Sequence, residues 1–142
     1  MKKILLTLIA MAFIVSNAVA DDKVVSPDTL PQAAKAFISS NFAGANATYV
    51  EKDFDSYDVQ LSNGVKIDFT RKGDWKKVES MQAPVPASVI PAPVADAVAK
   101  AHPQAAIMEV EKERGNFEIK LNNMMKLVVN PAGQIIGQKM DD

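Results

Sequence analysis

The sequence predicts an α+β fold built by tandem duplication, in which one helix and a four-stranded antiparallel sheet form a unit and the helices pack on one face of the sheet. The main observation is an internal repeat, because residues 30–79 align without a gap on residues 90–139. A repeat of this length indicates one supersecondary unit that is used twice. In each copy a helical apolar period is followed by strand-like alternation. The identical pairs are Pro31/Pro91, Ala45/Ala105, Val50/Val110, Glu51/Glu111, Lys52/Lys112, Leu61/Leu121, Asn63/Asn123, Lys66/Lys126 and Gly73/Gly133.

The first twenty residues predict a secretory signal peptide. Two lysines at positions 2 and 3 precede an apolar run at 4–15, and the small-x-small signal Ala-Val-Ala ends at Ala20. We therefore expect cleavage after Ala20 and a periplasmic or secreted protein. The predicted divisions are a signal peptide at 1–20, an N-terminal lead-in at 21–29, repeat unit one at 30–80, a proline-rich connector at 81–89 and repeat unit two at 90–140.

Composition excludes several classes of function. Cleavage removes two of the 16 basic residues, so 14 remain against 17 acidic residues and the net charge becomes −3. This balance and the lack of a basic stripe argue against nucleic-acid binding. No second apolar segment approaches membrane-spanning length, so no membrane association is expected after cleavage. The chain has no cysteine, which excludes thiol catalysis, thiolate metal sites and disulfides.

Each unit is predicted to begin with a helix. In the first, Pro31 suits the opening turn, an apolar face recurs through Ile38, and Gly44 ends the helix. In the second, the helix begins after Pro91 and stops at His102, because a residue before proline avoids the α region.

Alternation predicts the strands that follow. First strands are expected at 48–54 and 108–114, and fourth strands after the Gly73 and Gly133 turns. Between them, a hairpin whose three-residue loop ends with Gly64 in the left-handed region keeps every apolar residue on one face. That register pairs residues 57, 59 and 61 with 69, 67 and 65. The corresponding strands of the second unit are expected to pair in the same way.

The search for catalytic chemistry finds few candidates. The single histidine, His102, aligns with Phe42 and is interpreted as a packing residue at a helix end. No metalloprotease, nucleophile-elbow, phosphate-loop or dinucleotide motif occurs. We therefore expect neither enzymatic activity nor a cofactor.

A turn with three aspartates is a weak metal candidate. Asp53, Asp55 and Asp58 are close in sequence, but their spacing differs from that of a calcium-binding loop. Aspartate is also common in turns for local hydrogen bonding, so a solvated turn is the favoured interpretation.

The polar side of the strands is the candidate recognition surface. The predicted register sets Asp58 opposite Asp68, and Lys120 opposite Lys126, which gives one acidic and one basic end. A solvated surface and a partner-binding surface both fit this pattern. Tyr49 is expected to be exposed, whereas core placement is favoured for Trp75. The partner-binding candidates are Tyr49, Asp58, Gln60, Lys66, Asp68, Trp75, Glu118, Lys120 and Lys126.

Both copies share a longer pattern. It reads Leu/Ile-Pro, a helix, Val-Glu-Lys-Asp/Glu, an aromatic-acid-Val/Ile-x-Leu strand, Asn-Gly or Asn-Met, Lys-x-apolar and a turn glycine. Over residues 30–139 this pattern resembles the PepSY-like, β-lactamase-inhibitor-protein-like periplasmic family. The resemblance implies a curved antiparallel sheet with helices on its back and a polar concave face for a partner. Residues 124 and 135 depart from it, because the second copy lacks the hairpin glycine and the fourth-strand aromatic.

These observations together predict a non-enzymatic, protein-binding module of the periplasm. The family name suggests an inhibitor or modulator of an envelope enzyme that is contacted through the polar sheet face. The alternative is a small-ligand or cation-binding periplasmic module.

Overall fold

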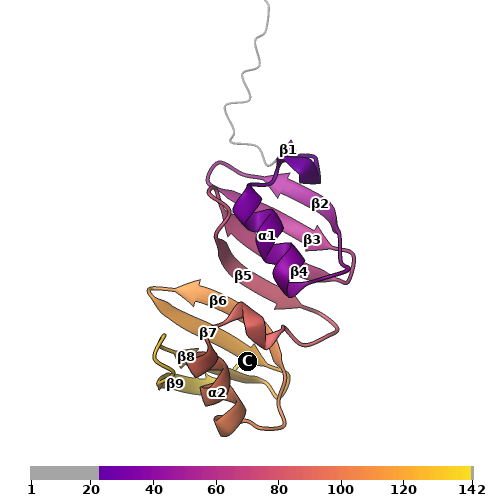
Figure 1. Ribbon diagram of the computed structural model, residues 1–142. Helices are drawn as coiled ribbons and strands as arrows, with labels where there is room; N and C mark the ends of the chain where they lie inside the picture. Colours follow the sequence, from indigo (N-terminus) through magenta and orange to yellow (C-terminus); the bar gives the residue numbers. More distant parts are fainter. Residues whose placement is uncertain (1–22, 142) are drawn as a thin grey trace, which may run out of the picture.

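The computed structural model describes residues 23–141, so the predicted signal peptide lies outside the described residues. The chain forms a nine-stranded antiparallel sheet with two short helices on one face (Figure 1). The helices are α1 (Gln32–Asn41) and α2 (Ala92–Ala101), preceded by the 3-10 turns η1 (Pro27–Thr29) and η2 (Ala87–Val89). The strands are β1 (Lys23–Val24), β2 (Ala47–Lys52), β3 (Ser56–Leu61), β4 (Val65–Thr70), β5 (Trp75–Ser80), β6 (Ile107–Glu113), β7 (Asn116–Leu121), β8 (Met125–Val129) and β9 (Ile135–Met140).

The predicted fold class is wrong. The strands follow one another from β1 to β9 in a single sheet, rather than forming a duplicated four-stranded unit. Strands β5 and β6, on either side of the predicted boundary between the units, pair antiparallel with Val78 opposite Val110. Both valines are fully buried, so pairing these strands extends one apolar layer instead of leaving two edges. With helices of only ten residues each, the protein is mostly β.

The hairpin registers are confirmed. Val59 lies opposite Ile67, and Gly64 has a φ of +84°. In the second hairpin Ile119 lies opposite Leu127, and Met124 takes the left-handed position with a φ of +68°. The alternation of apolar residues therefore sets the local register, because a shift by one would turn the buried residues toward water.

The helix boundaries follow the sequence signals. α1 ends at Asn41, before Gly44, and α2 ends before His102, whose N–H donates to the Val98 carbonyl at 2.9 Å. Each helix buries the side chains that recur at helical spacing against the sheet. These side chains are Ala34 and Ile38 in α1 and Val94 and Val98 in α2.

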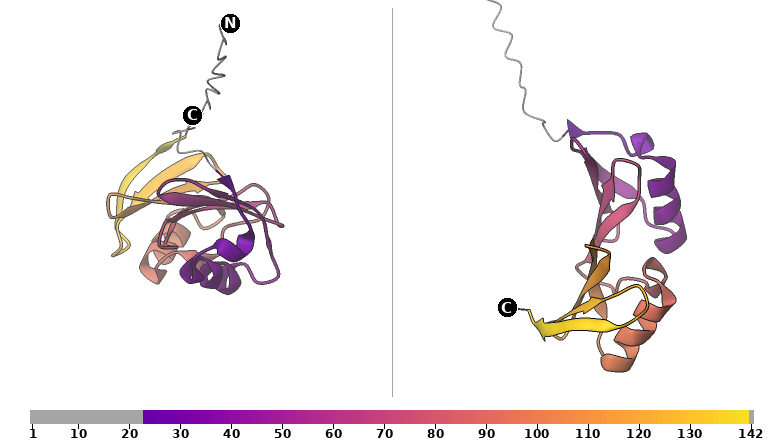
Figure 2. Two further views of the ribbon diagram at one scale, coloured as in Figure 1. Left: turned by 90° about the horizontal axis from the view of Figure 1, so that it is seen from above. Right: turned by 90° about the vertical axis from the view of Figure 1, so that its left-hand side faces the viewer.

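The core is confined to one side of the sheet. Val85 and Val89 of the proline-rich connector are buried, so the connector packs on this core as well. Figure 2 shows the sheet bending away from the helices, which places the helix-free face on the inside of the bend. None of the helices within residues 23–141 has the length and apolarity to cross a membrane.

Candidate functional site

The helix-free face of the sheet, here called the polar face, carries two rows of mainly charged side chains. They alternate with the buried residues, because successive side chains of a strand point to opposite faces. The first row is Glu51, Asp58, Asp68, Lys77, Glu111 and Glu118. The second row is Tyr49, Gln60, Lys66, Glu79, Glu109, Lys120, Lys126 and Lys139.

The acidic end of the polar face is formed by β2, β3 and β4. Asp58 lies directly opposite Asp68, as the sequence predicted. Burial, together with the charge of Asp58 and a hydrogen bond to it, raises the pKa of Asp68 to about 6. Lys77 and Lys76 on β5 oppose this rise only in part. The Asp68 carboxyl therefore keeps its proton to a higher pH than usual. A shallow hollow beside the two aspartates is lined by Tyr49, Glu51, Asp58, Val59, Gln60, Lys66 and Asp68.

This pair predicts that stability falls as the pH rises from about 4 to about 7. In that window folded Asp68 still holds its proton, whereas the unfolded carboxyl, with a pKa of 3.8, has lost it. We expect a decrease of about 1 kcal/mol in the free energy of unfolding, after a discount for solvent screening. Urea unfolding of Asp68→Asn should lack this slope, whereas Asp55→Asn in an exposed turn should keep it. An identical slope in Asp68→Asn would contradict the assignment.

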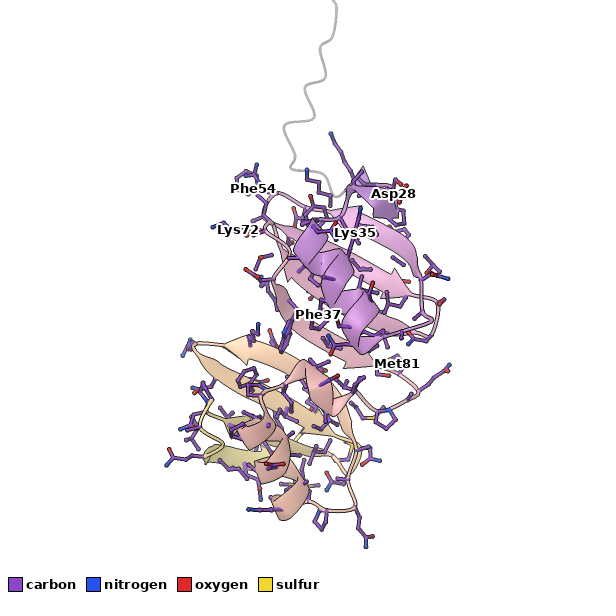
Figure 3. All side chains as sticks on the ribbon, in the orientation of Figure 1. Asp28, Lys35, Phe37, Phe54, Lys72 and Met81 are labelled. Carbon is purple, nitrogen blue, oxygen red and sulfur yellow. The ribbon has the colours of Figure 1, made fainter. Side chains whose placement is uncertain are left out.

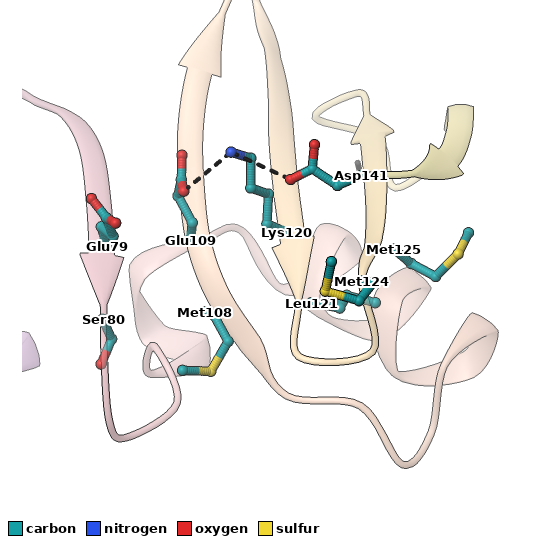
Figure 4. A pocket seen from close by; sticks show the side chains of 9 residues that line it. All are labelled: Glu79, Ser80, Met108, Glu109, Lys120, Leu121, Met124, Met125 and Asp141. Carbon is teal, nitrogen blue, oxygen red and sulfur yellow. Dashed lines mark ion pairs between the residues drawn. The ribbon is translucent and has the colours of Figure 1, made fainter.

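The basic end of the polar face is formed by β7, β8 and β9. Lys126 pairs with Glu118 at 2.5 Å, which raises the pKa of the lysine and lowers that of the carboxyl. Lys120 lies 3.5 Å from both Glu109 and Asp141 (Figure 4). Lys120 is opposite Lys126, which in turn is opposite Lys139. The three lysines form a row that is only partly neutralised by acidic neighbours.

Strands β5 and β6 form the middle of the polar face, between its acidic and its basic end. Lys77 on β5 contacts Glu109 on β6 at 3.1 Å. Although burial opposes it, the hydrogen bond to Glu109 raises the pKa of Lys77. The hollow in Figure 4 lies next to this pair and is lined by Glu79, Ser80, Met108, Glu109, Lys120, Leu121, Met124, Met125 and Asp141. Sequence reasoning missed this contact because it depends on β5 and β6 being neighbours.

The structure brings together all the predicted partner-binding candidates except Trp75. Tyr49 is 37% exposed and lies opposite Gln60 on the polar face. Trp75 is only 9% exposed and packs on the helix side, between Phe37 and Phe117, so we remove it from the candidate surface.

Two further residues lie away from the polar face. His102 ends α2 on the helix side, where its ring contacts Gln138 at 3.2 Å and Asn123 at 3.3 Å. Phe54 was predicted to end a strand, but β2 stops at Lys52 and Phe54 projects from the β2–β3 hairpin, 78% exposed (Figure 3). The aspartates around Phe54 are the signal for a turn that could have identified its exposure.

Acidic side chains gather at a place that the sequence did not indicate. Among the described residues, Glu111, Glu113 and Glu118 have carboxylate oxygens within 4.8 Å of one another. Glu118 is also bonded to Lys126, so part of this negative charge is compensated. The turn with three aspartates, the weak metal candidate predicted from the sequence, differs from this acidic cluster. There, Asp53 accepts a hydrogen bond from the Phe54 N–H at 2.6 Å, which is a local turn contact. The Glu111–Glu118 contact depends on the β6–β7 register and could have been read from it.

The chain is similar in sequence and in structure to known proteins. A family model described as "Putative beta-lactamase-inhibitor-like, PepSY-like" matches residues 18–63 and 55–137. A "putative periplasmic protein" of the DUF2874 family from Bacteroides vulgatus is 30% identical, with a TM-score of 0.78 over 85% of this chain and 98% of that chain. A "putative calcium-regulated periplasmic protein" from Bacteroides thetaiotaomicron is 29% identical, with a TM-score of 0.78 over 84% of this chain and 97% of that one. No curated protein matches the sequence.

A third similar structure is also described as periplasmic. It comes from Bacteroides vulgatus, has unknown function, and is 25% identical with a TM-score of 0.77 over 84% of this chain and 99% of that chain. The three descriptions agree with a periplasmic location. Cleavage after Ala20 concerns residues outside the described part of the chain and stays a prediction.

Proposed function

This chain belongs to the PepSY-like, β-lactamase-inhibitor-like family, and on that premise we propose that it is a non-enzymatic module that binds a protein partner through its polar face. The partner class that the family description suggests is an envelope enzyme, which the module would inhibit or modulate. The family description concerns the family as a whole, so the support for this proposal comes from the surface itself.

The observation that carries the proposal is the separation of charge across one uncovered face. Within the described residues, both helices pack on the opposite side of the sheet (Figure 2). Asp58 and Asp68 lie toward one end, and Lys126 and Lys139 toward the other. A partner with the reverse polarity would bind in one orientation, because charge complementarity directs encounter and register. Tyr49 offers an exposed aromatic group of the kind that concentrates binding energy.

Site-specific crosslinking tests the proposal. A photoreactive amino acid is placed at Gln60 on the polar face and, as the control, at Ser39 on the exposed side of α1. After incubation with envelope extract, we expect a defined adduct from position 60 and none from position 39. The double variant Asp58→Lys/Lys126→Glu keeps the net charge but reverses both ends, so it should lose the adduct. Its circular dichroism spectrum must match the wild type, since Lys126 has an ion pair. Retention of the same adduct by the folded double variant would contradict the proposal.

Cation binding is the alternative that this surface must be tested against. The acidic trio on β6 and β7 and the calcium-regulated relative are the observations that favour it. A ligand that binds only the native state raises the melting temperature. Under our proposal, calcium at millimolar concentration leaves the melting temperature of the wild type unchanged. A rise that disappears in Glu111→Gln would replace protein binding by cation binding as the function.

A further inference from the structure

The β9 strand forms an open edge of the sheet. It is the last strand in the order of the nine (Figure 1), and its side chains are mostly exposed. Ile136 and Met140 are 56% and 60% exposed. Natural proteins usually protect such edges, because the free N–H and C=O groups pair readily with another strand. The apolar character of β9 is therefore unusual for a surface that only meets water.

The β8–β9 ladder identifies which backbone groups of β9 point outward. The Asp141 N–H donates to the Met124 carbonyl at 2.7 Å, at the continuation of the register that pairs Lys126 with Lys139. Hydrogen-bonded pairs alternate along an antiparallel ladder. The alternation assigns Lys139 to a pair bonded to β8, and it directs the N–H and C=O groups of Gln138 and Met140 away from β8.

The charge of Lys139 indicates what kind of strand could pair with this edge. Lys139 is the outermost of the lysine row, and none of the ion pairs among residues 23–141 includes it. Like charges opposite one another on neighbouring strands are unfavourable, and an opposite charge is favourable. An added strand would therefore be stabilised by a carboxylate opposite Lys139 on the polar face.

A second copy of β9 does not supply that group. The strand Ile135–Met140 contains no acidic residue. Self-pairing about Gly137, Gln138 or Lys139 would set Lys139 opposite Ile135, Gly137 or itself, which leaves its charge uncompensated. Self-pairing about Met140 would set Lys139 opposite Asp141, but that carboxylate already lies 3.5 Å from Lys120, and this register would pair only the last residues of β9. A segment from a different protein with acidic residues fits the edge better.

We propose that β9 is a docking edge for an extended peptide segment in which acidic and apolar residues alternate. The segment would run antiparallel to β9. Its acidic residue would lie opposite Lys139 on the polar face, and the neighbours of that residue would bond to the outward groups of Gln138 and Met140 while packing beside Met140. Strand addition of this type takes affinity from main-chain hydrogen bonds and specificity from alternate side chains. The inference rests on the proposed function in that the ligand is a protein, but here the ligand pairs with the backbone of the sheet edge and only its acidic side chain reaches the polar face.

Synthetic peptides test the edge directly. The probe is a fluorescein-labelled heptapeptide of alternating valine and glutamate, and its matched control replaces glutamate by lysine. We expect the acidic peptide to bind and the basic one to bind at least tenfold more weakly. Because residues opposite Gln138 and Met140 bond to β9, N-methylation of the valines should abolish binding, whereas N-methylation of the glutamates should leave it nearly unchanged.

Protein variants locate the site. Lys139→Glu should weaken binding of the acidic peptide about tenfold, since attraction becomes repulsion. Lys72→Glu, the same change in an exposed turn at the other end of the molecule (Figure 3), should have no effect. Asp58→Lys should also have no effect, because Asp58 lies on β3 and not at this edge.

Three results would overturn the inference. They are equal binding of the two N-methylated peptides, equal binding of the acidic and basic peptides, and concentration-dependent dimers in sedimentation that Gln138→Pro abolishes. The outcomes separate from those of the proposed function. If the peptides fail to bind as expected but the crosslinked adduct from position 60 forms, only the docking edge is rejected. If the peptides bind as expected but the folded charge-reversed variant still forms the adduct, only binding through the polar face is rejected.

Discussion

Gly133→Ala is expected to destabilise the protein by about 3 kcal/mol, because the glycine combines backbone strain with close packing. Gly133 has a φ of +87°, a conformation that disfavours alanine. A Cβ at this position would also lie 2.5 Å from the carbonyl oxygen of Pro93, in the first turn of α2. Backbone atoms of a helix cannot move aside easily, so the β8–β9 turn and the helix would have to separate. Urea unfolding followed by the fluorescence of Trp75 measures the loss.

A matched control separates the two causes. Gly64 has a φ of +84°, but a Cβ there would meet no atom within 4 Å. Gly64→Ala should therefore cost about 1 kcal/mol from backbone strain alone. Gly73 is the counterpart that should behave like Gly133, since a Cβ would lie 2.8 Å from the Pro31 side chain and 2.9 Å from the Ala34 nitrogen. Similar losses for Gly64→Ala and Gly133→Ala would contradict the packing argument.

The turn glycines also show why parts of the fold could be predicted from the sequence. Local register depends on residues close in the chain, so alternation around Gly64 was sufficient to pair Val59 with Ile67. The same reasoning placed Asp58 opposite Asp68, and therefore anticipated the acidic end of the polar face. These contacts need no knowledge of the rest of the sheet.

The pairing of distant strands could not be derived in this way. Val78 and Val110 are 32 positions apart, and nothing local favours β6 over solvent as the neighbour of β5. The repeat itself misled the prediction, because it favoured a four-stranded unit used twice, whereas all nine strands follow one another in one sheet. Pairing β5 with β6 also creates the Lys77–Glu109 contact, which the sequence could have indicated only after that neighbour was known.

Trp75→Ala is expected to have the largest effect, a loss of about 4 kcal/mol in the free energy of unfolding. The indole is stacked between Phe37 of α1, at 5.9 Å, and Phe117 of β7, at 6.2 Å. The Lys112 ammonium lies 4.1 Å from the indole centroid and adds a cation–π contact. Removal of the ring would leave a cavity in the aromatic column that connects α1 to strands on both sides of the β5–β6 junction. Since Trp75 is the single tryptophan, unfolding must be followed by circular dichroism.

Because the aromatic column lies at the β5–β6 junction, Trp75→Ala should also loosen the strand pairing at that junction. With the indole gone, the amides of Val78 and Val110 should exchange hydrogen faster, because both valines pair across the β5–β6 junction that the aromatic column spans. Trp75→Phe retains part of the stack and should cost about 1.5 kcal/mol. Lys112→Met removes only the cation and should cost about 0.5 kcal/mol. A Trp75→Ala variant that lost less than Lys112→Met would show that the two halves of the sheet are held by strand pairing alone, and that the aromatic column contributes little.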